Sequence, residues 1–332
     1  MSIAKTQIAL YPLRFEPIFQ YRLWGGRRLE DLVSEPLPGD EPIGEAWILS
    51  DREDHPSRVA DGPLKGKTIK DLIELAPEEM LGPLAKHVTR FPLLLKFLDA
   101  SSMLSVQVHP SDKQKQFLPP GEAGKTEAWV VLMADPDSVI YAGLKPGTTP
   151  DDLRSLSSET ANNHLASFQP SIGDGVYIPA GTVHALGGGV VVFEVQQNSD
   201  VTFRLYDWDR VDPQTGHSRE LHVEQAIACV DFEQGEIGPV LPVVESTGPV
   251  WRDQIISCPF FEINRVVANS TFDCARAGSP IVLVCADGQG EIESGGAMHP
   301  VRKGDVYLLP AGMEACAFHP EGQVMVFEVS IP

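Results

Sequence analysis

A short turn motif that occurs twice is the feature that most restricts the fold of this chain. The two copies are GDGVYIPAGTVHA (173–185) and GDVYLLPAGMEAC (304–316), which share Gly-Asp and Pro-Ala-Gly at an offset of 131 residues. Gly-Asp, an apolar pair and Pro-x-Gly are typical of a strand that enters a tight turn. A strand pattern ending in Phe-Glu-Val follows each copy, at 193–195 and 327–329. We therefore expect two similar jelly-roll barrels; the alternative is a common hairpin turn that occurs twice.

The rest of the chain supports a mainly β fold. Residues 240–330 alternate Val, Ile and aromatic residues with polar ones, and Gly or Pro interrupts them at the spacing of a sandwich or small barrel. The chain has 332 residues, with 29 Gly and 28 Pro, which suits two domains built from many short strands. No low-complexity linker separates the halves, so we expect them to pack closely.

Only a few short helices are expected. Residues 68–86 (TIKDLIELAPEEMLGPLAK) have apolar residues at helical spacing. A helical insert is predicted at 149–168, where Thr149-Pro150-Asp151-Asp152 is a good helix start. A connecting helix is predicted at 218–230, opened by Ser218.

Charge and cysteine content exclude several classes of function. The net charge is −20 and no lysine- or arginine-rich block occurs, so nucleic acid is not an expected partner. No apolar run approaches the ~20 residues that span a bilayer, and the first fifteen residues lack a secretion signal. The five cysteines include no CxxC pair, which favours free thiols in the cytoplasm over disulfides. Such an acidic chain needs a local cluster of positive charge to bind an anion.

Four polar residues have the spacing of a metal site. Gln107 and His109 are two apart in a strand pattern and share a face, as Glu127 does with a lysine two positions before it. His184 follows the first turn motif, whereas the second has Ala315 at that place. Two imidazoles, a carboxylate and an amide carbonyl suit Zn²⁺, and would also hold Mn²⁺, Fe²⁺ or Ni²⁺.

One further strand has a polar face. In DVTFRLY, the residues Asp200, Thr202, Arg204 and Tyr206 alternate with apolar neighbours. The polar face is expected to face either a cavity or solvent, and the residues of this strand alone favour solvent.

Several longer motifs resemble those of type I mannose-6-phosphate isomerases in their short bacterial form. They are FPLLLKFLDASSMLSVQVHPSD, GKTEAWVVL, IPAGTVHALGGG and QQNSDVTFRLYDWDR, supported by LWGG, IGEAWILSD, SRVADG and RELHVEQA. The resemblance covers nearly the whole chain in the family's order. The large helical insertion of longer relatives is missing, which leaves the lid and the specificity contacts open.

The resemblance implies a zinc-dependent fold of two cupin-type barrels. Residues 1–235 match the metal-binding, catalytic cupin domain with helical insertions, and residues 236–332 match a degenerate cupin without metal. Gln107, His109, Glu127 and His184 match the family's zinc ligands, with one ion per chain and other divalent metals as alternatives.

The resemblance also implies an activity, the interconversion of mannose 6-phosphate and fructose 6-phosphate through an enediol. An isomerase of a related sugar or sugar phosphate and a non-catalytic sugar-binding cupin are the alternatives. The implied catalytic residues are Arg204, Lys96, Lys125 and Asp200, and the implied substrate-binding residues are Ser105, Lys125 and Arg204. Lys96, Lys125 and Arg204 would supply the cationic cluster that a phosphosugar needs.

The identity of the general base is left open by the sequence. Lys96 lies in the apolar stretch LLLKFL, and if buried it can serve as an acid–base group. A strand-edge lysine that reaches solvent is the alternative. Glu194, His184 and a zinc-bound water are the other candidates.

Overall fold

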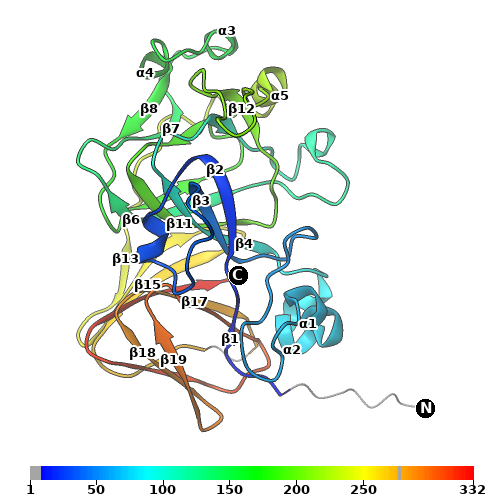
Figure 1. The fold of residues 1–332 in the computed structure, drawn as a ribbon, viewed down its shortest axis with the longest axis vertical. Coiled ribbons are helices and arrows are strands. Elements are labelled where there is room, and N and C mark those ends of the chain that lie inside the picture. Colours follow the sequence, from blue (N-terminus) through cyan, green and yellow to red (C-terminus); the bar gives the residue numbers. More distant parts are fainter. Residues whose placement is uncertain (1–8, 276–277) are drawn as a thin grey trace.

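Two antiparallel β-sandwiches are stacked along the long axis of the molecule (Figure 1). The structure is a computed structural model that describes residues 9–275 and 278–332. No secretion signal was expected in the first fifteen residues. Of these, residues 1–8 lie outside the described residues. None of the helices in the described ranges is long and apolar enough to cross a membrane.

The first sandwich is formed by strands from residues 18–206. Its six-stranded sheet has the order β2 (Ile18–Gly26), β3 (Ile43–Leu49), β4 (Leu93–Ala100), β11 (Val190–Gln197), β6 (Glu127–Ala134), β9 (Gly175–Ile178). Its five-stranded sheet has the order β12 (Phe203–Tyr206), β5 (Val106–Val108), β10 (His184–Leu186), β7 (Ile140–Leu144), β8 (Leu165–Phe168). One buried cluster joins Trp129 and Leu98 of the first sheet to Ile140 and Leu186 of the second, so the sheets pack face to face.

The second sandwich contains the C-terminal strands and one strand from the N-terminal end. Its seven-stranded sheet has the order β1 (Leu13–Arg14), β20 (Val306–Leu309), β17 (Ile281–Asp287), β22 (Val324–Ser330), β15 (Glu262–Ala268), β14 (Val250–Ser257), β13 (Val243–Ser246). Its four-stranded sheet has the order β16 (Phe272–Asp273), β21 (Ala317–Pro320), β18 (Gln289–Ser294), β19 (Ala297–Arg302). Buried residues such as Leu283 and Phe318 connect the two sheets.

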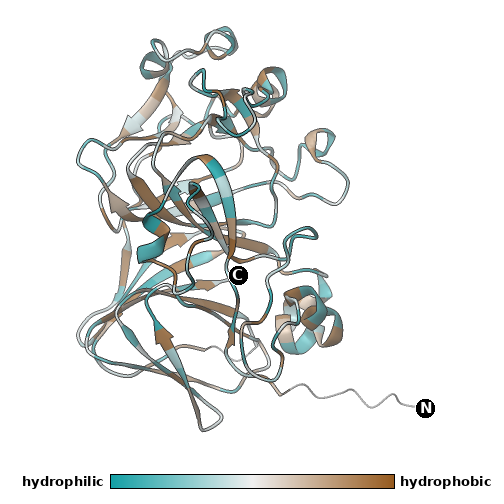
Figure 2. Cartoon of the chain, viewed as in Figure 1, coloured by the Kyte–Doolittle hydropathy of each residue, from teal (hydrophilic) through white to brown (hydrophobic). Residues whose placement is uncertain are grey.

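A continuous apolar core joins the two sandwiches, which confirms the expected close packing. Phe193 of β11 stacks on Phe327 of β22 with ring centroids 5.6 Å apart. The six-stranded sheet is therefore covered on both faces, and every residue of β3, β4 and β11 is buried. Strands buried on both faces are apolar nearly throughout. The hydrophobic colour of these middle strands in Figure 2 shows this, while the peripheral loops are mostly hydrophilic.

The repeated motif forms the same turn in both sandwiches. Gly173 has φ 91° and Gly304 has φ 87°, a left-handed conformation that favours glycine. In each copy the following aspartate, Asp174 or Asp305, accepts a hydrogen bond at 2.8 Å from the backbone N–H three residues before it. The motif therefore recurs because both barrels need this turn, which confirms the prediction of two similar barrels.

We expect Gly304→Ala to destabilise the protein more than Gly322→Ala. A Cβ at Gly304 would lie 1.4 Å from the backbone oxygen of Leu32, whereas Gly322, with φ 82°, has no atom within 4 Å. The left-handed conformation alone costs about 1–2 kcal/mol for an alanine, and the backbone clash is added only at Gly304. Urea unfolding of both variants checks this; equal midpoints would contradict the account.

The helix predicted at 68–86 is wrong in its length. Three short helices replace it: α1 (Ile69–Leu75), α2 (Pro77–Leu81) and the 3₁₀ helix η2 (Gly82–Lys86). Pro77 has no N–H and disfavours helical angles at the residue before it, so Ala76 has φ −146° and ends α1. Thr68 starts α1 with a capping box to Asp71. Two further 3₁₀ helices are η1 (Arg28–Asp31) and η3 (Lys115–Phe117).

The other two helical predictions are confirmed in part. The insert contains α3 (Pro150–Arg154), capped by Thr149 as predicted, and α4 (Ala161–His164). The connecting helix α5 (Val223–Cys229) is shorter than predicted, and Ser218 does not start it. The residues before α5 make contacts with β12 and the turn after it instead of forming helix. Arg219 forms an ion pair with Asp207, and the His222 N–H donates to the Arg204 carbonyl at 2.8 Å.

Candidate active site

A row of polar and aromatic residues crosses the six-stranded sheet of the first sandwich. Lys96 of β4 lies directly opposite Trp47 of β3 and Glu194 of β11, and Glu194 lies opposite Trp129 of β6. Residues directly opposite one another on neighbouring strands project from the same face. The four side chains therefore face the space between the two sheets.

A second row crosses the five-stranded sheet. Gln107 of β5 lies opposite His184 of β10 on one side and Arg204 of β12 on the other. This pairing explains why three residues that are far apart in the sequence share one site. Because Gln107 and Arg204 lie opposite one another, their side chains project from the same face of the sheet.

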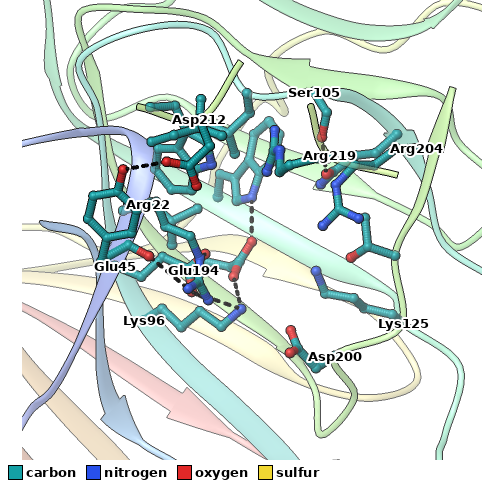
Figure 3. A pocket seen from close by; sticks show the side chains of 18 residues that line it. Arg22, Glu45, Lys96, Ser105, Lys125, Glu194, Asp200, Arg204, Asp212 and Arg219 are labelled. Carbon is teal, nitrogen blue, oxygen red and sulfur yellow. Dashed lines mark hydrogen bonds and ion pairs between the residues drawn. The ribbon is translucent and has the colours of Figure 1, made fainter. Parts of the chain in front are cut away.

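A cavity of about 400 Å³ lies beside these two rows (Figure 3). In Figure 3 the Arg204 and Lys125 side chains lie on one side and Arg22, Glu45 and Lys96 on the other. All the predicted catalytic and substrate-binding residues line the cavity. The lining consists of Tyr21, Arg22, Leu23, Trp24, Glu45, Lys96, Leu98, Leu104, Ser105, Gln107, Lys125, Trp129, Glu194, Asp200, Thr202, Arg204, Asp212 and Arg219.

Three of the four predicted metal ligands form a compact, buried group. Ligand atoms of His109, Glu127 and His184 all lie within 4.8 Å of one another. The Nε2 atom of His109 is 3.3 Å from Oε2 of Glu127, and the Nε2 atom of His184 is 3.3 Å from Oε1 of the same residue. Each histidine has its Nδ1 atom 2.9 Å from a backbone oxygen, of Val201 and Thr182 respectively. Such a contact fixes the tautomer and turns the Nε2 lone pair toward the group.

The protonation states of this group suit a cation. Burial lowers the pKa of His109 to about 3, and the nearby Lys125 acts in the same direction. Burial alone would raise the pKa of Glu127, but Lys125 and His109 hold it well below its usual value. Both Glu127 oxygens are buried, and the nearest groups to them are Lys125, His109 and His184. Two imidazole nitrogens and a carboxylate that converge on one buried point are a donor set that fits a divalent metal ion.

Gln107 lies beside this group, with its amide nitrogen toward it. Its Nε2 is 3.2 Å from Nε2 of His184, and its Oε1 accepts a hydrogen bond from the Ser105 hydroxyl at 3.1 Å. An amide binds a metal through oxygen, so ligation by Gln107 requires the amide plane to be turned over. In that orientation Ser105 accepts from the amide instead of donating to it.

Lys125 connects the metal group to the cavity. Its Nζ is 2.9 Å from Glu127 Oε2 and 3.2 Å from His109 Nε2, as the shared strand face predicted. Burial would lower the pKa of Lys125, but Glu127 and Glu194 raise it above its usual value. Lys125 is therefore a fixed positive charge at the end of the cavity next to the metal group.

Lys96 is buried and paired, so the alternative of a solvent-exposed lysine is wrong. Its Nζ is 3.2 Å from Glu194 Oε2 and 3.9 Å from Glu45 Oε2. The Trp129 indole donates to the other oxygen of Glu194 at 3.0 Å. Burial opposes ionisation of Glu45, but Lys96 and an arginine beside it lower the pKa of Glu45 to about 2. Lys96 and Glu194 thus form a buried ion pair that lines the cavity.

Arg204 reaches the cavity without a fixed partner. Its Nε is buried and makes no hydrogen bond within the described residues. Burial lowers the pKa of Arg204, and the nearby Arg219 adds to this effect. Asp200 lines the same cavity and acts to raise the pKa of Arg204, but no hydrogen bond or ion pair joins the two side chains in the described ranges. Tyr206 leaves the polar face, because a register shift after Arg204 turns it into the core.

Sequence reasoning missed Arg22, Glu45 and Arg219. Arg22 Nε is 2.9 Å from Glu45, which gives that cavity wall a second ion pair. Arg22 lies directly before the LWGG motif and Arg219 lies inside RELHVEQA, two motifs noted for the resemblance. Neither motif showed by itself that these side chains turn toward the cavity.

Comparison with known proteins identifies the family. Residues 13–135 match the family described as phosphomannose isomerase type I, catalytic domain. The mannose-6-phosphate isomerase ManA of Bacillus subtilis is 34% identical over 311 residues, which cover 91% of this chain and 94% of that protein. The chain belongs to the type I mannose-6-phosphate isomerase family. A family member from Streptococcus mutans is 33% identical and covers 95% of this chain and 97% of its own length.

A solved structure from the same family supports the fold. The crystal structure of the mannose 6-phosphate isomerase from Bacillus subtilis superimposes with a TM-score of 0.87 at 31% identity. The match covers 96% of this chain and 99% of the other. The two cupin-type barrels with a few short helices are therefore the fold of this family member.

Proposed function

We propose that the protein interconverts mannose 6-phosphate and fructose 6-phosphate through an enediol, with a zinc ion held by His109, Glu127 and His184. Gln107, with its amide oxygen turned inward, is proposed as a fourth ligand. The observation that carries the proposal is a buried His-Glu-His group beside a cavity where Lys125 and Arg204 lie near the metal group. The related mannose-6-phosphate isomerases from Bacillus subtilis and Streptococcus mutans suggest the substrate.

Positive charge at the metal end of the cavity fits the chemistry of an aldose–ketose isomerase. The reaction removes the proton from C2, forms an enediol and returns a proton to C1, while negative charge develops on oxygen. A bound divalent ion would supply a Lewis acid for these oxygens. Lys125 and Arg204 place fixed donors at the same end, where burial strengthens their interaction with an oxyanion.

The Lys96–Glu194 pair is our candidate for the proton transfer. His184 is the weaker candidate, because its Nδ1 faces the Thr182 carbonyl and its Nε2 faces Glu127. Glu194 would accept the proton from C2 and deliver it to C1, while Lys96 holds the carboxylate charge. The Trp129 indole fixes the other carboxylate oxygen, so the orientation of Glu194 is set before substrate binds.

A coupled assay tests the function. Purified protein with mannose 6-phosphate should form fructose 6-phosphate, and exhaustive chelation should stop the reaction until zinc is restored. A panel of other hexose 6-phosphates and unphosphorylated mannose distinguishes the alternatives. Faster turnover of another sugar would favour the related isomerase, and binding without turnover of any sugar would favour a sugar-binding cupin.

We also propose that residues 1–235 form the catalytic unit and residues 236–332 a metal-free cupin, in a cytoplasmic enzyme. Among the described residues, the histidines of the second unit have other partners. His299 stacks on Tyr11 with ring centroids 6.2 Å apart, and His319 is 2.8 Å from Glu293. The five cysteines are all free, as suits a reducing compartment.

Replacing His299 and His319 together by alanine should leave zinc content and turnover nearly unchanged. Neither imidazole belongs to the metal group, and neither lines the cavity. Elemental analysis and the coupled assay check this on a double variant that still melts cooperatively. Loss of zinc from such a folded protein would place a ligand in the second barrel and overturn the division.

A further inference from the structure

Three arginines gather around a single carboxylate at the edge of the cavity. Asp207, which follows β12, accepts from Arg219 at 2.8 Å and 2.6 Å through Nε and Nη2, and from Arg210 at 2.5 Å. Arg204, the third arginine, is close enough to Arg219 for the two charges to repel. Asp207 contacts two arginines directly, and a third arginine lies beside them. The single carboxylate therefore leaves an excess of positive charge at this edge of the cavity.

An unusual backbone turn fixes Asp207 in this position. Trp208 and Asp209 have φ values of 56° and 54°, a left-handed conformation that costs energy in residues other than glycine. Side-chain contacts hold the turn: the Trp208 indole donates to the Leu104 carbonyl at 2.6 Å, and Tyr206 donates to Asp209 at 2.7 Å. The strained turn directs the Asp207 carboxylate toward the arginines.

Arg219 has hydrogen-bonding capacity left for a ligand. Its Nε and Nη2 contact Asp207, while its Nη1 makes no hydrogen bond in the part of the chain that the structure describes. The side chain is 21% exposed and lines the cavity. The neighbouring Arg204 has a buried Nε without a hydrogen-bond partner among the described residues. A buried guanidinium donor without a partner, beside a second guanidinium with a donor to spare, indicates a site for an anion.

We propose that Arg219, positioned by Asp207, binds the phosphate group of the substrate and makes the enzyme prefer phosphorylated sugars. The strand register supports this division of the cavity, since Arg204 lies opposite Gln107 and so belongs to the metal end. A phosphate monoester carries two negative charges near neutral pH, and a planar guanidinium binds it through paired hydrogen bonds. The identity of the sugar rests on the proposed function; the phosphate site does not.

The loop that carries Arg219 is also attached to the opposite wall of the cavity. Asp212, in the same loop, accepts a hydrogen bond from the Tyr21 hydroxyl of β2 at 3.1 Å. Asp212 and Asp200 also line the cavity and are negative, so the anion is expected on the side of Arg204 and Arg219. Figure 3 shows Arg219 next to Arg204, with Asp200 below Lys125.

The test compares Arg219→Ala and Arg219→Lys with a matched control, Arg265→Ala. Arg265 binds Asp253 through the same two-pronged contact and is also 21% exposed, but it lies in the second sandwich. For Arg219→Ala we expect KM for mannose 6-phosphate to rise about 10- to 100-fold, the usual loss for a hydrogen bond to a charged group. The kcat should change by no more than about threefold, because the reacting carbons are distant from this group.

Two further measurements isolate the phosphate. Inorganic phosphate, titrated calorimetrically, should bind Arg219→Ala about 10- to 100-fold more weakly than the wild type. Arg219→Lys should fall between them, since it keeps the charge and loses the planar fork. Turnover of unphosphorylated mannose, where measurable, should be the same in the wild type and both variants. The Arg265→Ala control should match the wild type in all three measurements.

The outcomes separate this inference from the proposed function. Wild-type phosphate affinity and KM in a folded, zinc-replete Arg219→Ala protein would overturn the phosphate site even if isomerase activity is present. A wild type that binds phosphate through Arg219 but does not isomerise mannose 6-phosphate would overturn the proposed function and leave the site standing. A fall in kcat without a change in KM would move Arg219 from binding to catalysis and overturn the assignment.

Discussion

Replacing His184 by alanine is expected to release the metal and reduce turnover of mannose 6-phosphate by on the order of 10³ or more, the loss of several kcal/mol of transition-state stabilisation. His184 supplies one of the three donors that cluster among the described residues, and its Nε2 is 3.3 Å from Glu127 Oε1. Without it, the two remaining donors cannot complete the coordination of a tightly bound zinc ion. Elemental analysis should find about one zinc ion per chain in the wild type and much less in the variant.

The control for this variant is His217→Ala, which removes an exposed histidine outside the metal group. It should keep both zinc and activity, so that loss of either can be assigned to position 184. The thermal midpoint of His184→Ala must also be measured, because this residue is buried. A protein that works at full rate after exhaustive chelation would contradict the metal site itself.

The two barrels were predictable because their signals are local. A left-handed glycine followed by an aspartate that bonds back to the backbone is a turn that the sequence alone can report, and Gly173 and Gly304 both form it. The alternation of side chains along a strand is also local, which is why Gln107 and His109 were expected to share a face. Where one residue interrupted the pattern, as Pro77 does in the helix predicted at 68–86, the length of the element was wrong.

The meeting of groups from different sheets needed the resemblance or the structure. Glu127 belongs to the six-stranded sheet and His184 to the five-stranded sheet, so no spacing along the chain shows that they are 3.3 Å apart. The Lys96–Glu45 contact joins the neighbouring strands β4 and β3 of one sheet, and no spacing along the chain shows that pairing either. Tyr206 was assigned to the wrong face because strict alternation does not foresee the register shift after Arg204.

Loop residues were the least predictable part of the site. A helix was expected to begin at Ser218, so Arg219 was treated as a helical residue. In the structure α5 begins only at Val223, and Arg219 lies in the loop before it. Its side chain reaches the cavity because the strained turn at Trp208 and Asp209 presents Asp207 to it. Backbone strain of this kind depends on tertiary contacts, such as the one from Trp208 to Leu104, that no local pattern contains.

The second large effect is expected at Arg204. If this guanidinium stabilises the charge of the enediolate, Arg204→Ala should lower kcat by on the order of 10²–10³, the cost of removing a preorganised oxyanion donor. The structure favours this role because Arg204 lies opposite Gln107 at the metal end and its Nε has no partner among the described residues. Zinc content should stay at the wild-type level, since Arg204 is not part of the metal group.

Comparing Arg204→Lys with Arg204→Ala separates charge from geometry. Lysine keeps the positive charge but not the planar fork of donors, so we expect it to rescue little of the lost kcat. Kinetics on zinc-replete protein then decide between two roles. A higher KM with unchanged kcat would mean that Arg204 binds the phosphate together with Arg219, because uniform binding affects KM alone. A fall in kcat at similar KM would instead assign Arg204 to the charge that forms on the sugar oxygens, and leave Arg219 to hold the phosphate.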